Sequence, residues 1–393
     1  MNWFIDLAKC CGCAACEQVC PQKCITMTCD DEGFLFPIKV ESECVSCGLC
    51  EKVCPVKNQN VNVEETPKAF VYQTDDEKVL NVSSSGGFFS LLSAWVISQG
   101  GVVFGSRFSK NWEVVIDYTD TYAGLSAFRG SKYVAASVGN AFRQAREFLE
   151  EGKLVLFTGT PCQISGLTHF LRKPYDNLLA VDLMCHSVPS PKVWHYYLQS
   201  ICHGNQITDV TFRSKHFGWS RYGLKVMSKK EIILHEPNDE NPYMKGFIVG
   251  LFNRNSCSQC PARGLNTGSD IMIGDYWEID EHHHHLNDDR GMSLLLALTD
   301  KGKNLVYRIG KNACLQEIPY DWVDTKHVHH TIVCSASPHP NRSSFFSSFK
   351  KHPEKVELLI AKYLEKTPHV SLFKRVKRKI RKNIQRVYGT VSE

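Results

Sequence analysis

The sequence lacks any apolar run that could cross a bilayer, and it lacks a secretory signal. Its longest apolar stretches, such as LLSAWVI at 91–97, fall well short of the roughly 18–20 residues that a spanning helix needs. The first ten residues, MNWFIDLAKC, have neither the basic start nor the apolar core of a signal peptide. We therefore expect a cytoplasmic protein in a compartment that keeps thiols reduced.

Common cofactor-binding fingerprints are also absent from the sequence. Neither G-x-G-x-x-G nor G-x-x-x-x-G-K-[ST] occurs, and the C-x3-C-x2-C spacing of radical enzymes does not occur either. A standard dinucleotide-binding fold and a P-loop are therefore not expected.

Cysteine, by contrast, is abundant. The chain has 18 cysteines in 393 residues, and eleven of them precede residue 55. A secreted disulfide scaffold is usually short and spreads its cysteines along the fold, whereas neighbours in tight runs are poorly placed to pair with each other. The clustering therefore indicates metal binding. With 43% hydrophobic residues, a chain of this length predicts two or more domains.

Two cysteine runs share the spacing C-x2-C-x2-C-x3-C-P, the first ending at Pro21 and the second at Pro55. This is the bacterial two-cluster signature, in which the fourth cysteine of each run ligates the cluster of the other run. The spacing assigns one 4Fe-4S cluster to Cys10, Cys13, Cys16 and Cys54, and the other to Cys44, Cys47, Cys50 and Cys20. Zinc is the alternative, but four-cysteine zinc sites use paired C-x2-C motifs.

Residues 1–60 are predicted to form an α+β, ferredoxin-like two-cluster domain, with β-like stretches at 25–30 and 33–40. Cys11, Cys24 and Cys29 exceed the needs of two clusters. We interpret them as buried thiols or as packing near the clusters.

From Lys68 onward, apolar β-like runs alternate with helical patterns, which predicts a larger α/β domain with a largely parallel core sheet. Strands are expected at 69–73, 100–108, 153–159, 177–185, 269–277 and 292–299, and helices at 86–98, 139–150, 162–172 and 190–203. The predicted organisation is a linker at 61–67, the α/β domain over 68–345, a helical segment over 346–370, and a basic amphipathic tail over 371–393.

Two stretches of the α/β domain are suited to binding phosphate. SSSGG (83–87) lies at the start of a helical segment, where serine hydroxyls and free helix N–H groups can hold an anion such as a flavin diphosphate. In RGSKYV (129–134), Arg129 and Lys132 could pair with phosphates. A serine N-cap on an ordinary helix and an exposed basic loop are the alternatives.

Three further motifs carry cysteines. GTPCQISG places Cys162 at a helix start, where a thiol is expected to have a lowered pKa. DLMCHSVPSP places Cys185 at the end of a strand, and NSCSQCPARG holds Cys257 and Cys260. A C-x2-C pair needs completing, so we hypothesise that these four cysteines hold a third 4Fe-4S cluster. A zinc or redox-active C-x2-C with unrelated buried cysteines is the alternative.

In this order, the motifs closely resemble the coenzyme F420 hydrogenase/dehydrogenase beta-subunit family, in the form with an N-terminal two-cluster ferredoxin domain. The resemblance covers roughly residues 1–340. It implies a bound FAD, a 4Fe-4S cluster in the α/β domain, and electron exchange with a hydride carrier such as the deazaflavin F420. It also implies flavin contacts from Ser84, Ser85, Gly86, Gly87 and Lys132. Ser187 departs from the family pattern, because a glycine is expected after the Cys-His pair.

The predicted function is that of an iron–sulfur flavoprotein oxidoreductase with its own substrate, F420 or a similar hydride carrier. The alternatives are an electron-transfer beta subunit whose chemistry lies in a partner, and a ferredoxin-fused scaffold without flavin. The predicted cofactors are two N-terminal 4Fe-4S clusters, a third 4Fe-4S cluster and FAD. His186 and Asp275 are candidates for proton handling or substrate contact, with a structural hydrogen bond as the alternative for each.

Charge is divided between the two ends of the chain. Residues 1–66 carry five Lys/Arg and ten Asp/Glu, whereas residues 372–393 carry eight Lys/Arg and one Glu. We expect a ferredoxin or other redox protein to dock at the acidic end. The basic tail fits an anionic membrane surface, with peripheral association at its inner face; a helix that docks a protein partner or is merely solvated is the alternative. No nucleic-acid partner is expected, since no recognised binding module is present.

Overall fold

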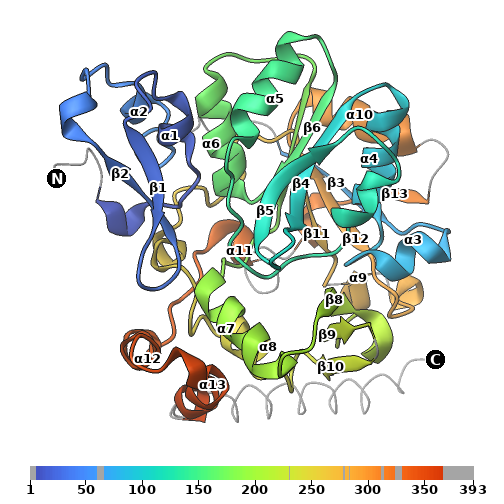
Figure 1. The fold of residues 1–393 in the computed structure, drawn as a ribbon. Coiled ribbons are helices and arrows are strands. Elements are labelled where there is room, and N and C mark those ends of the chain that lie inside the picture. The colour runs from blue at the N-terminus through green and yellow to red at the C-terminus, as the bar shows by residue number, and fades with distance from the viewer. Residues whose placement is uncertain are drawn as a thin grey trace.

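The computed structural model describes residues 6–59, 66–229, 231–277, 279–282, 284–310, 314–323 and 330–365. Figure 1 shows three parts within these ranges: a small N-terminal unit, a large central sheet covered by helices, and a second lobe built from a small sheet and helices. Most of the predicted linker and the whole basic tail (371–393) lie outside the described residues. Within the described ranges, no helix has the length and apolar character needed to span a membrane.

The N-terminal unit is small and carries both cysteine runs. It contains α1 (Ala15–Val19), β1 (Ile25–Cys29), β2 (Leu35–Lys39) and α2 (Leu49–Lys52). The two strands pair antiparallel, with Ile25 opposite Lys39, as the predicted β-like stretches require. Each helix begins after a residue with left-handed backbone, Ala14 at φ 60° and Gly48 at φ 71°. These turns direct each cysteine loop into the helix that follows it.

The central sheet has eight strands in the order β13-β3-β12-β11-β7-β6-β4-β5. Their bounds are β3 Lys68–Tyr72, β4 Val102–Phe108, β5 Val114–Thr119, β6 Val155–Gly159, β7 Leu178–Leu183, β11 Ile271–Asp275, β12 Ser293–Ala297 and β13 Leu315–Ile318. All six strands expected from the sequence are confirmed. The expectation of a largely parallel sheet is wrong, because only the pairs among β4, β6, β7 and β11 are parallel. The other four pairs, β4–β5, β11–β12, β12–β3 and β13–β3, are antiparallel.

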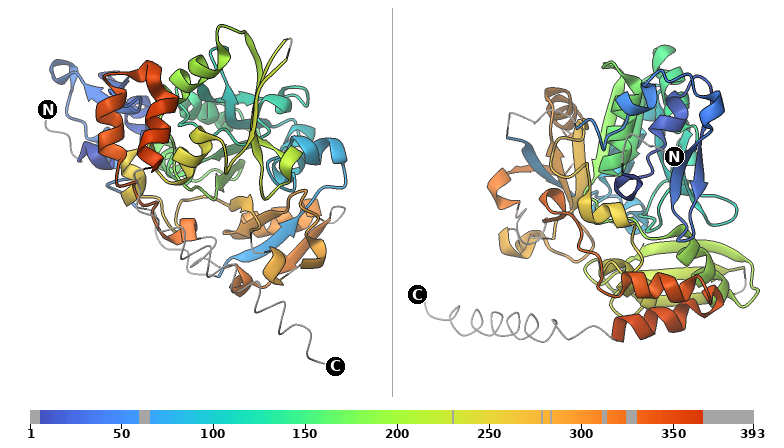
Figure 2. Two further views of the ribbon diagram at one scale, coloured as in Figure 1. Left: turned by 90° about the horizontal axis from the view of Figure 1, so that it is seen from below. Right: turned by 90° about the vertical axis from the view of Figure 1, so that its left-hand side faces the viewer.

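Helices cover both faces of the central sheet, as Figures 1 and 2 show. On one face, α4 (Phe88–Ser98) and α10 (Asp300–Gly310) bury Phe88, Leu92 and Leu305. On the other face, α5 (Ala141–Glu150) and α6 (Pro161–Leu171) share a core with Ala15 of α1, so the N-terminal unit packs directly onto this layer. The four helices expected from the sequence are confirmed as α4, α5, α6 and α7 (Pro191–Cys202).

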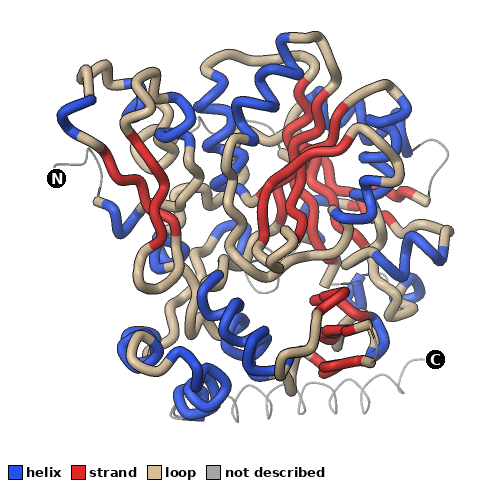
Figure 3. Tube along the Cα trace, in the orientation of Figure 1, coloured by secondary structure: helices blue, strands red, loops and turns tan. Residues whose placement is uncertain are grey.

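The second lobe was not anticipated as a separate layer. Its sheet has the order β10-β9-β8, with β8 Ile207–Ser214, β9 Gly223–Ser228 and β10 Ile232–Pro237. Helices α7, α8 (Pro242–Ile248), α12 (Arg342–Phe349) and α13 (Val356–Glu365) pack with it around the buried Trp194 and Tyr243. Figure 3 shows this small sheet below the large one. The short helices α3 (Glu77–Val82), α9 (Ile279–His282) and α11 (His330–Val333) complete the described elements of this type.

Candidate cofactor sites

The first predicted cluster set gathers in the N-terminal unit. Cys10, Cys13 and Cys54 are buried. Burial raises the pKa of Cys16, and so do the charges of Cys10 and Cys54. Burial likewise raises the pKa of Cys54, with a smaller contribution from Cys10. The loop before α1 and the end of α2 therefore bring these four thiols together.

The second predicted set lines one small cavity. Its wall includes Cys20, Cys44, Cys47 and Cys50, together with Cys24. Cys24 lies 3.5 Å from Cys20 between sulfur atoms and shares a hydrogen bond with it. Burial, then this bond, raises the pKa of Cys24 to about 11. Cys20, which the spacing assigns to this set, and Cys24 therefore both line the cavity.

The third predicted set comes from three distant segments. Cys162 lies in the first turn of α6, Cys185 follows β7, and Cys257 and Cys260 lie in and after the short turn η5 (Asn255–Gln259). Burial raises the pKa of Cys185, and so do the charges of Cys257, Cys162 and Cys260. Burial raises the pKa of Cys257 to about 12, again with contributions from Cys162 and Cys260. The fold therefore brings together four cysteines that span almost a hundred positions of the sequence.

One expectation for this set is wrong. The pKa of Cys162 is raised, not lowered, because its thiol shares a hydrogen bond with Cys11 and is buried beside it. The hydrogen bond and the burial outweigh the lowering of the Cys162 pKa that we expected from the N-terminus of α6. Cys11 also shares a hydrogen bond with Cys13, so it lies between the first and third sets. This agrees with its interpretation as packing near the clusters.

The chemistry of these donor sets fits iron–sulfur clusters. Buried thiols that raise each other's pKa resist ionisation unless a cationic group binds among them. In the described part of the chain, no three Cys, His, Asp or Glu side chains converge on a position for a single metal ion. A cubane is wider than one ion, because each thiolate binds a different iron atom.

A large cavity opens beside the third set. Its volume is about 690 Å³, within the range of cofactor and ligand sites. The predicted residues in its wall are Ser84, Ser85, Gly87, Arg129, Lys132, Cys185, His186 and Asp275. Parts of β6, β7 and β11 also line it. The cavity thus joins both predicted phosphate-binding stretches to a cysteine of the third set.

One end of the cavity is polar. The hydroxyl of Ser84 lies 2.9 Å from that of Ser131 and accepts a hydrogen bond from the Ser131 amide at 2.7 Å. The Ser85 hydroxyl donates to the carbonyl of Met292. None of these serines caps α4, whose N-cap is Gly87 with φ 92°. The predicted alternative of an ordinary serine cap is therefore wrong.

Gly86 is not in the cavity wall. It is buried against β3, where a Cβ would lie 1.9 Å from the carbonyl oxygen of Tyr72. Its amide donates to the hydroxyl of Ser293 on β12 at 3.0 Å. Only glycine allows this close approach, so Gly86 fixes the loop to the sheet behind the cavity.

Two cations face the polar end without a carboxylate partner among the described residues. The ammonium of Lys132 donates only to the carbonyls of Ala127 and Arg129, at 3.0 and 2.9 Å. Burial lowers the pKa of Lys132 to about 7. Arg129 donates from Nε to the hydroxyl of Ser90 at 3.0 Å. Cations that lack counter-charge fit a ligand that supplies it, as the diphosphate of FAD would.

Sequence reasoning missed Arg213, which organises this wall. Its guanidinium is buried and donates to both oxygens of Asp275 at 2.8 and 2.9 Å. It also donates to the carbonyl of Ser84 at 2.8 Å, and the indole of Trp219 donates to Asp275. Asp275 therefore has the structural role given as its alternative. No local motif marks Arg213, because its partners lie far away in sequence.

Comparisons with known proteins agree with the cysteine geometry. Residues 152–321 match the family model for the C terminus of the coenzyme F420 hydrogenase/dehydrogenase beta subunit, and residues 37–57 match that of a 4Fe-4S binding domain. The predicted resemblance to the coenzyme F420 hydrogenase/dehydrogenase beta-subunit family is thus confirmed over residues 152–321. A chain from the F420-reducing [NiFe] hydrogenase complex of Methanosarcina barkeri is 13% identical, with a TM-score of 0.45 over 77% of this chain and 92% of that chain. No curated protein sequence matches.

At the position where we expected the family's glycine, this chain has Ser187. The serine is buried, lines the cavity, and accepts a hydrogen bond from the amide of Asn253. The departure therefore adds a polar anchor to the wall beside Cys185. The next residue upstream, His186, contacts the carbonyl of Ile248 through Nε2 at 3.0 Å and packs edge-on against Phe247. That bond gives the ring the structural role named as its alternative.

Proposed function

We propose that this chain is an iron–sulfur flavoprotein oxidoreductase that passes electrons between N-terminal 4Fe-4S clusters, a third cluster, FAD and a hydride-carrying substrate. The observation that carries the proposal is the position of Cys185. This residue belongs to the third cysteine set and also lines the large cavity. A cluster bound by Cys185 would lie at the wall of the compartment that we assign to the flavin and the substrate.

The first cysteine set adjoins the third set, whose Cys185 lines the cavity. Cys11 links Cys13 of the first set to Cys162 of the third by hydrogen bonds. A flavin would exchange single electrons with clusters and a hydride with an organic substrate. Ser84, Arg129 and Lys132 would hold its diphosphate, while Cys162, Cys185, Cys257 and Cys260 would hold the third cluster. F420 or a similar carrier is the proposed substrate, and a ferredoxin or other redox protein is the proposed partner at the acidic N-terminal unit.

The first test is anaerobic reconstitution followed by measurement of iron, sulfide and bound flavin. We expect about twelve iron atoms per chain, four for each of three cubanes, and a flavin absorption band. C185S should lose about four of these iron atoms and slow the reduction of the flavin by dithionite-reduced viologen. C202S is the matched control, because Cys202 is a buried core thiol of α7 outside all three sets. A wild-type protein with no flavin band, or with only about eight iron atoms, would contradict the proposal.

The name of the family favours a second candidate, an electron-transfer beta subunit with no substrate of its own. The two candidates differ in what the isolated chain can do. If reduced, reconstituted protein transfers hydride to F420 or NAD(P)H without any partner, the chain has its own substrate. If it reduces only one-electron acceptors until a partner subunit is added, the second candidate is correct.

A further inference from the structure

Arg254 is a buried cation between the N-terminal unit and the third cysteine set. Only 5% of the residue is exposed. Its Nε donates to the carbonyl of Cys10 at 2.8 Å, and its Nη2 donates to the carbonyl of Leu35 at 2.9 Å. The guanidinium also lies 4.2 Å from the ring centre of Phe36. One side chain thus connects a cysteine of the first set to the segment that carries Cys257.

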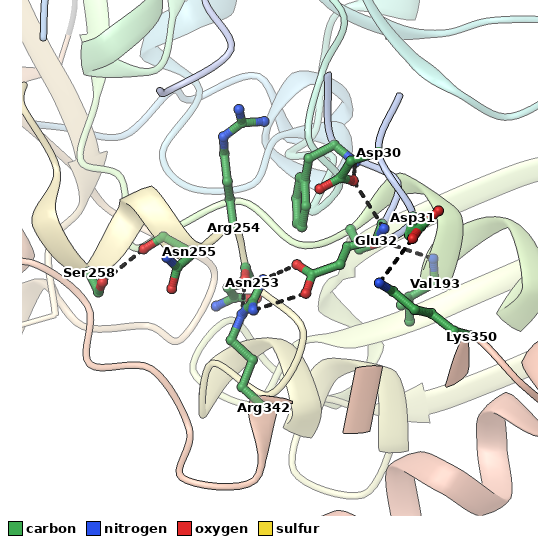
Figure 4. A network of polar contacts seen from close by, with 12 residues as sticks. Asp30, Asp31, Glu32, Val193, Asn253, Arg254, Asn255, Ser258, Arg342 and Lys350 are labelled. Atoms are coloured by element: carbon green, nitrogen blue, oxygen red, sulfur yellow. Dashed lines mark hydrogen bonds and ion pairs between the residues drawn. The ribbon is translucent and has the colours of Figure 1, made fainter. Parts of the chain in front are cut away.

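Arg254 differs from the other buried arginines in its partners. Arg213 is paired with Asp275, and Arg342 is paired with Glu32. For Arg254, no carboxylate partner is present among the described residues, and its hydrogen bonds go to neutral carbonyls. Figure 4 shows its side chain extending away from Glu32, toward which Arg342 points. A buried charge without a counter-charge is costly, so an anionic group is expected nearby.

Arg254 also lies beside segments that carry cysteines of the first and third sets. A Cβ on Gly12, between Cys10 and Cys13, would lie 2.9 Å from Nη1 of Arg254. The amide of Cys257 donates to the carbonyl of Arg254 at 3.1 Å. Burial raises the pKa of Cys257, and the positive charge of Arg254 acts against that rise.

The two cysteine sets approach each other at the same place. A Cβ on Gly166 of α6 would lie 3.0 Å from the sulfur of Cys13. Thus α6, which begins with Cys162 in its first turn, packs directly against the first set. A charge at this junction acts on both sets at short range.

We propose that Arg254 is a shared counter-ion for the clusters of the first and third sets, and that its charge raises the reduction potential of one or both of them. This inference rests on the proposed function, since it requires clusters at these sites. Four thiolates give a 4Fe-4S cluster a net negative charge, and reduction adds one more. A buried cation stabilises the reduced form, because net charge and hydrogen bonding set cluster potentials. Arg254 is a positioning residue in this account and touches no substrate.

The test is an anaerobic redox titration followed by electron paramagnetic resonance, with iron analysis of each sample. C54S and C185S, which each remove one thiol, assign the signals to the first and third sets. R254Q should retain its iron and make at least one of these two clusters harder to reduce by tenfold or more, about 59 mV for one electron. R342Q is the matched control, because Arg342 is also buried at the N-terminal unit but pairs with Glu32. It should leave the potentials unchanged.

Full iron content with wild-type potentials in R254Q would overturn the proposal, as would an equal shift in R342Q. If R254Q loses iron instead, the R254K variant separates the effect of charge from that of geometry. Lysine keeps the positive charge but lacks the planar set of N–H donors of the arginine guanidinium. Recovery of iron and of wild-type potentials in R254K supports the counter-ion role. An R254K protein equally depleted of iron overturns it. Absence of clusters from the wild-type protein would contradict the proposed function itself, and that result is visible before any variant is made.

Discussion

The buried guanidinium of Arg213 donates to both carboxylate oxygens of Asp275, at 2.8 and 2.9 Å. The pair joins β8 of the second lobe to β11 of the central sheet. Because the same guanidinium holds the carbonyl of Ser84, this contact connects the packing of two lobes to the polar end of the cavity.

Replacing Asp275 with asparagine should destabilise the protein and weaken flavin binding together. The side chain of Arg213 is only 3% exposed, and loss of its partner leaves a buried charge unpaired. Such a loss costs about 3–5 kcal/mol. Urea unfolding measures the stability, and quenching of flavin fluorescence measures the affinity.

D117N is the matched control for D275N. Asp117 pairs with Arg107 on neighbouring strands, but both side chains are about one-third exposed. Water can solvate the remaining group, so the cost should stay below about 1 kcal/mol. Equal losses of stability in the two variants would contradict the role of burial.

Flavin affinity should fall as the pH rises above about 7. Burial lowers the pKa of Lys132 to about 7, from an ordinary value of 10.5. Below this pH the ammonium is ready to meet a diphosphate, whereas above it a proton must be taken up on binding. The affinity should therefore drop by up to about tenfold per pH unit until the pKa of the bound state is reached.

The same pKa has an opposite effect on the stability of the flavin-free protein. The unfolded chain holds the proton of Lys132 up to about pH 10.5, while the folded chain releases it near pH 7. Stability from this group therefore increases as the pH rises between these values.

Titrations of flavin binding between about pH 6 and pH 9 check the predicted fall in affinity, with K132M as the variant and K132R as its charged control. A slope that persists in K132M would show that another group titrates.

C20S and C24S should differ in iron content although the two thiols are neighbours. Both line the second cysteine cavity and lie 3.5 Å apart. The repeat spacing makes Cys20 the ligand, so C20S should lose about four iron atoms per chain and C24S should retain them. Iron and sulfide analysis after identical reconstitution provides the comparison. Loss of iron in C24S with full retention in C20S would reverse the assignment.

Deletion of residues 371–393 should release the protein from anionic vesicles. The last 22 residues carry eight Lys/Arg against one Glu, with apolar residues at helical spacing. Each basic residue near an anionic surface contributes about 1 kcal/mol, and salt screens the attraction. Sedimentation with phosphatidylserine vesicles at low and high salt checks this, with neutral vesicles as the control. Unchanged binding after deletion would discard the membrane role of the tail.

The strands and helices at the centre of the fold could be predicted from local pattern. β6 and β7 are buried on both faces, so they read as continuous apolar runs, and α5 and α7 show one apolar stripe. The edge strands β5 and β13 were missed because both are partly polar and partly exposed, as edge strands can be.

The sequence by itself predicted the two N-terminal cysteine sets, because three cysteines of each set lie in one tight run and the repeat of that run identifies the fourth. Tertiary structure alone brought Cys162 and Cys185 to Cys257, and Arg254 to Cys10. It also decided that Asp275 pairs with Arg213. Contacts between residues tens or hundreds of positions apart depend on how sheets and helices pack, and no local periodicity carries that information.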